Sequence, residues 1–233
     1  MHLPRRILPG ALLSVALLFA PRPAGAEQAG EQTFVQSFEN GTNEGGWTFG
    51  TGNEFLVADI GNPGVCVFDA SLISYAPRAS TSFGVSSVFT GDWAARGVVR
   101  IGIDLATAWA EANMGERPLT VILLNDNNTP YDLEDDWGAY LVSTQLAPRP
   151  GAVTADASAL NWSSYEFEIP ARDHQLPPGW GWIARNTIRP GGSWTRLMGD
   201  VSHVAFMYGD IRKLYLIFGY QVALDNPRIT VRP

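Results

Sequence analysis

Apolar and polar residues alternate along several short stretches of this chain, as they do in strands with one buried and one solvated face. In the stretch VVRIGIDL, Val99, Ile101 and Ile103 lie on one face and charged residues lie on the other. The stretch SYEFEIP alternates in the same way. Segments of this kind are rich in β-branched and aromatic residues and are bounded by Gly, Pro, Asn and Asp, which predicts strands. The predicted strands are 33–39, 54–60, 64–69, 98–105, 119–124, 137–143, 164–169, 201–208, 214–223 and 228–231.

Helical patterns are few. Residues 106–114 fit two helical turns that end at Gly115, and Ser193 fits the cap of a short helix over 193–198. Strands and helices do not alternate regularly, so a parallel sheet is not expected. The pattern predicts an all-β fold: a single antiparallel β-sandwich of the jelly-roll kind, with one or two short helices in its loops.

The first 26 residues have the pattern of a cleavable export signal. Arg5 and Arg6 precede an apolar run at 11–20, and the small residues 24–26 follow it. The run is shorter than the roughly 20 residues that a membrane span needs. We therefore expect cleavage after Ala26, and a secreted or periplasmic β-sandwich domain at 27–233 with no membrane span. The oligomeric state is left open.

Charge and cysteine content narrow the class of protein. The formal net charge is −7, and the signal carries three arginines and no acid, so the mature chain is more negative still. An acidic surface argues against nucleic acid or an anionic membrane as partner. Cys66 is the only cysteine, which rules out an internal disulfide. Its surroundings, VCVF, predict a small apolar residue in a buried strand.

The segment NDNNTPYDLEDDW at 125–137 is the part of the chain richest in side-chain oxygen. It does not fit an EF-hand, because Pro130 and Tyr131 occupy the fifth and sixth positions of the loop. A glycosidase pair is also disfavoured, since adjacent carboxylates on a strand point to opposite faces. Residues 125–136 are predicted to form an exposed loop between two strands. Asp132 and Asp136 are its candidates for binding a ligand or a second, weaker cation.

Aromatic residues are the other candidates for ligand binding. Trp180 and Trp182 lie two apart, so on an extended chain they share a face. They form either a platform for sugar rings or a buried pair. Trp93 and Trp137 lie in or beside turn-like sequence and are further candidates. No complete catalytic set or zinc spacing is present.

Two segments resemble the galactose-binding-like β-sandwiches, which include many carbohydrate-binding modules and the laminin IV (laminin B) domains. They are SFENGTNEGGWTF at 37–49 and ALDNPRITV at 223–231. The segments IGNPGVCVF at 60–68 and FTGDWAARGVVRIGIDL at 89–105 are similar to stretches of laminin-B-like secreted bacterial proteins. The resemblance covers most of the mature chain, but each motif is short.

The resemblance implies a structural Ca²⁺ ion that joins the first and last strands. Glu39 and Asp225 would be its carboxylate ligands, with carbonyls from 40–46 completing the oxygen shell. In the alternative without a metal, Glu39 caps the turn and Asp225 bonds Asn226 or Arg228.

The sequence therefore favours a secreted, non-enzymatic binding domain for carbohydrate or extracellular surface polymer. One alternative is an adhesion or structural domain with a protein partner, in which the tryptophans belong to the core. A second alternative is a hydrolase or lyase acting on polysaccharide. For this second alternative the nearest carboxylate pair is Glu166 and Glu168.

Overall fold

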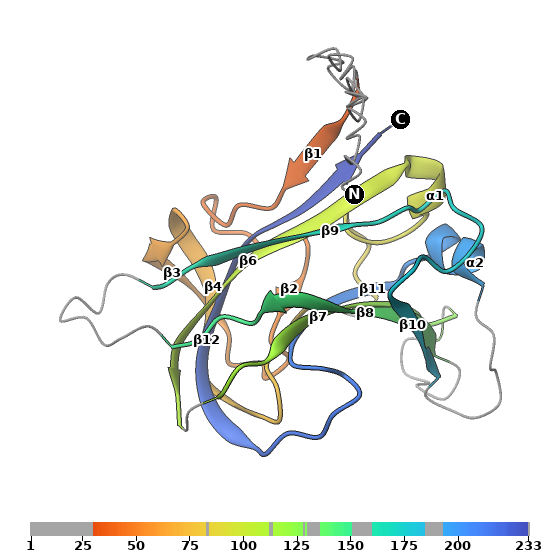
Figure 1. Cartoon of the computed structure of the whole chain (residues 1–233). Coiled ribbons are helices and arrows are strands. Elements are labelled where there is room, and N and C mark those ends of the chain that lie inside the picture. The colour runs from red at the N-terminus through yellow and green to blue at the C-terminus, as the bar shows by residue number, and fades with distance from the viewer. Residues whose placement is uncertain are drawn as a thin grey trace, which may run out of the picture.

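Two antiparallel sheets face each other and form a sandwich (Figure 1). A computed structural model describes residues 30–82, 84–111, 114–127, 129, 136–150, 160–184 and 193–232 of the chain. The predicted export signal lies outside these residues. The prediction of an all-β antiparallel sandwich with one or two short helices is confirmed.

Sheet A is built around the long strand β12. Its spatial order is β3 (Phe55–Gly61), β4 (Gly64–Ser74), β12 (Phe218–Val231), β6 (Val98–Ala110) and β9 (Ser163–Glu168), and β1 (Gln32–Val35) also pairs with β12. β3 and β9 are the outer strands of this order. Because β12 pairs with β4 and β1 on one side and with β6 on the other, it holds together segments from both halves of the chain.

Sheet B lies opposite and contains the remaining strands. Its spatial order is β10 (Trp180–Ala184), β8 (Trp137–Leu146), β7 (Pro118–Asn125), β11 (His203–Tyr208), β5 (Arg78–Thr81) and β2 (Trp47–Thr48). The two short helices, α1 (Trp93–Arg96) and α2 (Trp194–Gly199), lie in connections between strands. The predicted cap of α2 is confirmed, since the Ser193 hydroxyl accepts a hydrogen bond from the Arg196 N–H.

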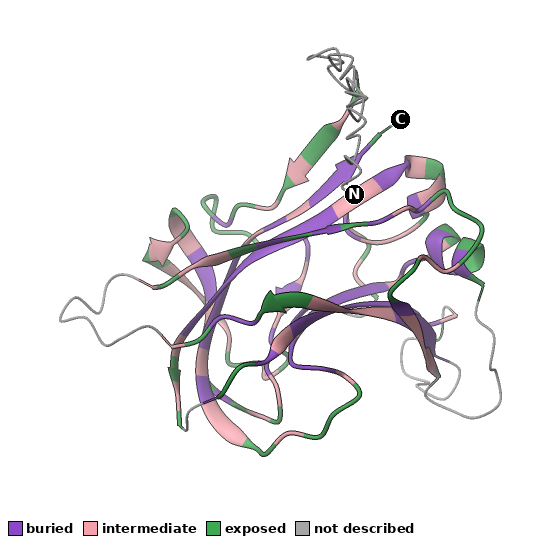
Figure 2. Ribbon diagram, viewed as in Figure 1, coloured by how far each residue is buried: buried purple, intermediate pink, exposed green. Residues whose placement is uncertain are grey.

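One hydrophobic cluster fills the space between the sheets, and Figure 2 shows the buried positions running along the central strands of both layers. Trp47, Trp93 and Trp194 are among its largest members and are almost completely buried. Phe206 of sheet B contacts Trp47 of the same sheet and Phe167 of sheet A, so aromatic side chains join the two layers. A core of this size stabilises the fold without a disulfide, in keeping with the predicted burial of Cys66.

Three predictions about local structure are wrong. Residues 106–114 do not begin a helix, because β6 continues as a strand to Ala110 and pairs with β12. The predicted strands 214–223 and 228–231 merge into one strand, β12, which begins only at Phe218 and is interrupted by a bulge at Asn226, where φ is +46°. The third error is omission: β2, β5 and β10 were not predicted as strands.

Within the part of the chain that the structure describes, no helix has the length and apolar character that crossing a membrane requires.

Candidate functional site

Trp109 is the tryptophan most accessible to a ligand. All eight tryptophans of the chain lie in the described ranges, and Trp109, with 46% of its surface exposed, is the most exposed of them. It lies near the end of β6, on the face of sheet A that points away from the core. An exposed aromatic ring on a sheet face is a ready contact for another molecule.

A bulge in β6 turns Trp109 outward. Ala106 pairs with Ala223 and Thr107 pairs with Val222, but Trp109 pairs with Gln221, so Ala108 is an extra residue in the ladder. Side chains alternate between faces along a strand, and an inserted residue reverses the alternation beyond it. Without the bulge, Trp109 would share the inward face of Thr107.

Gly219 on β12 makes room for the indole ring. A Cβ atom built on Gly219 would lie 3.4 Å from Cζ3 of Trp109, so the benzene part of the indole covers this glycine. Glu111 fixes the other side of the glycine. Its Oε2 accepts a hydrogen bond of 3.0 Å from the Gly219 N–H, and its own N–H donates to the Gly219 carbonyl at 2.9 Å. The indole therefore rests on a stretch of backbone that is held in place.

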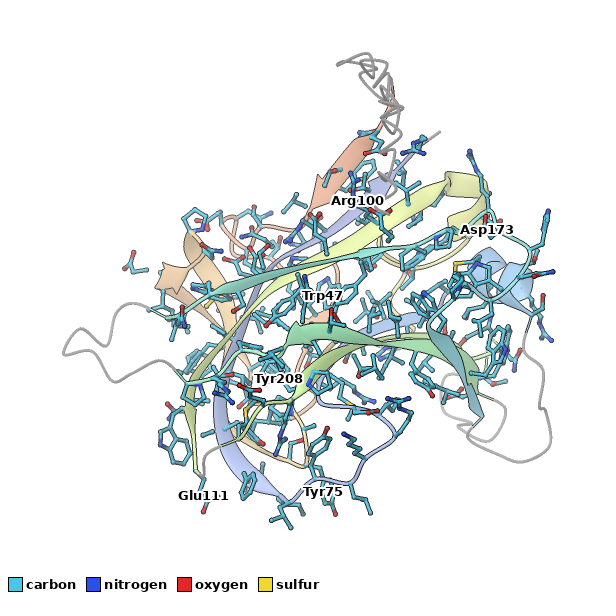
Figure 3. The ribbon with its side chains drawn as sticks, in the orientation of Figure 1. Trp47, Tyr75, Arg100, Glu111, Asp173 and Tyr208 are labelled. Atoms are coloured by element: carbon cyan, nitrogen blue, oxygen red, sulfur yellow. The ribbon has the colours of Figure 1, made fainter. Side chains whose placement is uncertain are left out.

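Three further exposed side chains extend this surface. Ile73 pairs with Gly219 across the sheet, and Tyr75 and Ile217 adjoin the next pair of that ladder. They are exposed by 74%, 56% and 52% of their surfaces. We call Ile73, Tyr75, Trp109 and Ile217 the Trp109 platform. Figure 3 shows Tyr75 and Glu111 at the same end of the sandwich.

Two polar side chains beside the platform, those of Glu111 and Gln221, have hydrogen-bonding groups that no described residue uses. Glu111 Oε1 receives no hydrogen bond from the described residues, because only Oε2 of this carboxylate is engaged. The Gln221 amide, opposite Trp109 in the ladder, makes no hydrogen bond within the same part of the chain. An aromatic surface flanked by a free carboxylate oxygen and a free amide can bind a ligand through both its apolar and its hydroxyl groups.

The tryptophans selected from the sequence belong to the core. Trp93, Trp137 and Trp180 are buried, and Trp182 is partly buried against them. Trp180 and Trp182 do share a face, as predicted, but it is the inner face of β10. Of the two alternatives for Trp180 and Trp182, the structure shows the buried pair and not the platform for sugar rings. Rings that pack in the core cannot stack on a ligand at the surface.

Aromatic contacts explain this inward orientation. Trp180 meets Trp194 of α2 edge to face, with ring centroids 5.1 Å apart. Trp182 meets Trp137 of β8 with centroids 6.0 Å apart. Such pairs add stability beyond the area that they bury.

Hydrogen bonds hold the start of the oxygen-rich segment at 125–136 against residues 200–202. Asp132 lies outside the described residues. Asp136 is buried, and so are Asn125 and Asp126, which corrects the prediction of a solvated loop at both ends of the segment. The Asn125 amide donates to the Asp200 carbonyl at 2.6 Å. Hydrogen bonds to the connection between α2 and β11 therefore account for part of the polarity of this segment.

The structure brings Glu39 and Asp225 to the same hairpin, between β3 and β4. Glu39 Oε1 accepts from the Val65 N–H at 2.8 Å, and Asp225 Oδ2 accepts from the Asn62 N–H at 2.6 Å. Burial raises the pKa of Asp225 to about 6, and the negative charges of Asp104 and Glu39 act in the same direction. The backbone N–H groups of Asn62 and Asn226 oppose this rise.

These residues do not fit a calcium site in the arrangement observed. Both oxygens of Asp225 already accept N–H groups, the second from Asn226 at 2.7 Å. Asp104, the next carboxylate, is paired with the Arg228 guanidinium at 2.9 Å. Calcium needs six to eight oxygen ligands, and the described residues contain no group of three or more potential metal-binding His, Cys, Asp or Glu side chains. The hydrogen bond from the Asn226 N–H to Asp225 agrees with the alternative without a metal, and the calcium site stays a prediction.

No protein-family model matches the chain, and no curated protein sequence matches it. Several solved structures are similar in fold. A family 11 carbohydrate-binding module from Clostridium thermocellum, in complex with a β-1,3-1,4-mixed-linked tetrasaccharide, is 15% identical, with a TM-score of 0.40 over 86% of this chain and 95% of that one. The K2 cleaved adhesin domain of Lys-gingipain is 11% identical, with a TM-score of 0.36 over 84% and 97%.

An exo-β-agarase is 12% identical, with a TM-score of 0.43 over 84% of this chain but only 24% of its own. Likenesses at these identities and TM-scores transfer no ligand and no activity to this protein.

Proposed function

We propose that the protein is a secreted, non-enzymatic carbohydrate-binding domain that holds a polysaccharide against the Trp109 platform. The observation that carries the proposal is the position of Trp109, the one exposed tryptophan among eight, on the outer face of sheet A. Its indole rests on the backbone of Gly219, and beside it lie a Glu111 oxygen and the Gln221 amide, to which no described residue is hydrogen-bonded.

The chemistry of the platform suits a sugar polymer. A sugar ring has C–H groups on its faces and hydroxyls at its rim. The rings of Trp109 and Tyr75 offer apolar contact, while Glu111 Oε1 and the Gln221 amide offer partners for hydroxyl groups. Glu111 and the acidic balance of the chain favour a neutral polymer over an anionic one.

The shape favours a polymer over a small molecule. The platform is made of side chains exposed by about half or more, and it lies on a sheet face. A small ligand on such a surface would keep most of its area in water, whereas ligand pockets bury the larger part of a small ligand. An extended chain gains affinity by contacting several such side chains at once.

A protein partner is the second candidate, because Ile73 and Ile217 give the platform an aliphatic component, and exposed apolar patches also mark protein interfaces. Catalysis has less support. Glu166 and Glu168 lie on the outer face of β9, where Glu166 pairs with Arg228 at 3.0 Å and Glu168 faces Arg100 at 4.0 Å. Both are exposed, and their arginine partners account for them without a substrate.

Pull-down on insoluble polysaccharides, together with a glycan array, tests the proposal. We expect retention of the wild type on at least one neutral polysaccharide and its loss in Trp109→Ala. Leu146→Ala is the matched control, because Leu146 is also 46% exposed but lies on sheet B. Retention by none of the polysaccharides, or equal retention of both variants, would refute the proposal. Capture on an immobilised protein that depends on Ile73 and Ile217 would favour the second candidate.

A further inference from the structure

A separate cavity lies at the open seam between the two sheets. It has a volume of about 320 Å³ and is bordered by β2, the edge strand of sheet B, and by β3, the edge strand of sheet A. Its wall includes Asn43, Thr48, Glu54, Phe55, Val67 and Ser82. Ligand pockets in proteins have volumes of roughly 300–1,000 Å³, so this one is near the lower limit and suits a single small ring.

Glu54 is the charged group of the cavity, and only one of its oxygens is used by the fold. Oε1 accepts from the Thr48 hydroxyl at 2.7 Å, from the Phe49 N–H at 2.9 Å and from the Thr51 N–H at 3.0 Å. Oε2 receives no hydrogen bond from any other described residue. The three donors fix the carboxylate while the second oxygen is left available to a ligand.

The same hydrogen bonds keep the carboxylate ionised. Burial tends to raise the pKa of Glu54, but the donors from Thr48, Thr51 and Phe49 and the backbone N–H of Glu54 itself together outweigh it and lower the pKa below its usual value. An ionised carboxylate only accepts hydrogen bonds. A ligand of this cavity must therefore bring donors such as hydroxyl groups, and an anion would be repelled.

The rest of the wall is both polar and apolar. Ser82 donates its hydroxyl proton to the Gly46 carbonyl at 2.8 Å, so its oxygen can accept from a ligand. Asn43 uses its amide to hold the backbone of Trp47, at 2.6 and 2.9 Å, and thereby fixes the rim. Phe55 and Val67 supply apolar contact. Phe55 is half exposed at the mouth of the cavity, where its ring meets Phe68 edge to face.

We infer that this cavity is a second binding site that takes one neutral, polyhydroxylated ring, the size of a monosaccharide. Apolar walls match the C–H faces of such a ring, and the fixed acceptors, Glu54 Oε2 and the Ser82 oxygen, match hydroxyls at its rim. The cavity and the platform are distinct sites. Val67 and Ile73 lie six residues apart on β4, which is roughly 20 Å along an extended strand. An extra residue between Asp69 and Leu72 reverses the alternation, so Val67 points into the core and Ile73 points out of sheet A.

A titration monitored by ¹H–¹⁵N correlation spectra tests the inference, with glucose, galactose, mannose and xylose as probes. We expect at least one of them to shift the amide signals of Thr48, Phe49 and Thr51 in a saturable way. Glu54→Gln should weaken this binding at least about tenfold, which corresponds to about 1.4 kcal/mol. Glu168→Gln, a change of the same kind at an exposed position on β9, should leave the affinity unchanged.

The outcomes separate this inference from the proposed function. Trp109→Ala should leave monosaccharide binding intact, and Glu54→Gln should leave polysaccharide retention intact. The cavity is not a sugar site if no probe shifts these amides, or if Glu54→Gln binds as tightly as the wild type. Stronger shifts with methylammonium than with every sugar would also overturn the inference, by identifying a site for cations. If Glu54→Gln does not fold, Phe55→Ala gives the same test.

Discussion

The indole of Trp109 and the backbone of Gly219 form one unit: a Cβ atom on the glycine would lie 3.4 Å from Cζ3 of the ring. This distance is an ordinary van der Waals contact, so alanine fits beneath the indole and a larger side chain does not. The position of the Trp109 indole therefore depends on the small size of Gly219, which lies beneath the ring.

Substitution at Gly219 tests this relationship. Gly219→Ala should bind polysaccharide like the wild type. Gly219→Leu should displace the indole and reduce retention on polysaccharide severalfold. The melting temperature of Gly219→Leu should stay unchanged or rise, because glycine weakens a strand interior and the new side chain faces outward. Equal retention of the two variants would show that the position of the indole does not matter for binding.

Arg228 holds the outer face of sheet A together and should be important for stability. Its guanidinium bonds Asp104 at 2.9 Å and Glu166 at 3.0 Å, and Asp104 is buried. Arg228→Met leaves the Asp104 carboxylate without this partner, which should lower the free energy of unfolding by about 3–5 kcal/mol.

The control for Arg228 is an exposed ion pair. Arg149 lies 3.5 Å from Glu116, and both side chains are largely exposed. Arg149→Met should lower the free energy of unfolding by less than about 1 kcal/mol. Urea unfolding measures both values. Similar losses in the two variants would contradict the structural importance of the buried pair.

Asp225 should make stability depend on pH in an unusual direction. Its folded-state pKa of about 6 lies above the ordinary value of 3.8. The folded protein therefore holds this proton more tightly than the unfolded chain does. The contribution is fully present below the unfolded-state pKa and is lost as the pH rises through about 6.

A comparison with Asp225→Asn isolates this effect. Between pH 4 and pH 7 the wild type should lose roughly 2 kcal/mol relative to the variant, because a pKa shift from 3.8 to about 6 acts over this range. Urea unfolding across this range measures the difference. A constant difference between the two proteins would mean that the pKa of Asp225 is not raised.

Adding calcium distinguishes the two roles predicted for Glu39 and Asp225, which are ligands of a calcium ion or hydrogen-bond acceptors without a metal. Because N–H groups already bond both oxygens of Asp225, we expect the same melting temperature in calcium and in chelator. Differential scanning calorimetry makes this comparison directly. A higher melting temperature in calcium that disappears in Asp225→Ala would establish the metal site implied by the family resemblance.

The sequence predicted the architecture better than the site, for physical reasons. Alternation of apolar and polar residues depends on burial, which is why β9 was predicted to within one residue at each end and β6 from its first residue to Leu105. The same alternation shows that Trp180 and Trp182 share a face but not which face, because both faces of an aromatic-rich strand can be buried. That choice depends on Trp194, which is distant in the sequence.

Trp109 was missed because two features of its surroundings conceal it. The sequence ATAWAEAN is rich in residues that favour helix, and pairing with β12 overrides that preference. The bulge at Ala108 then reverses the alternation, so the pattern of β6 predicts the wrong face for Trp109. No local signal marks a bulge that forms only through pairing with a strand more than a hundred residues away.

Oxidative footprinting of tryptophans by mass spectrometry tests most directly whether the platform binds polysaccharide. In the free protein, Trp109 should be oxidised faster than the seven other tryptophans, which are buried or partly buried. With the retained polysaccharide bound, we predict that oxidation of Trp109 slows several-fold and that the others are unchanged. An unchanged rate at Trp109 in the complex would show that the polymer binds elsewhere.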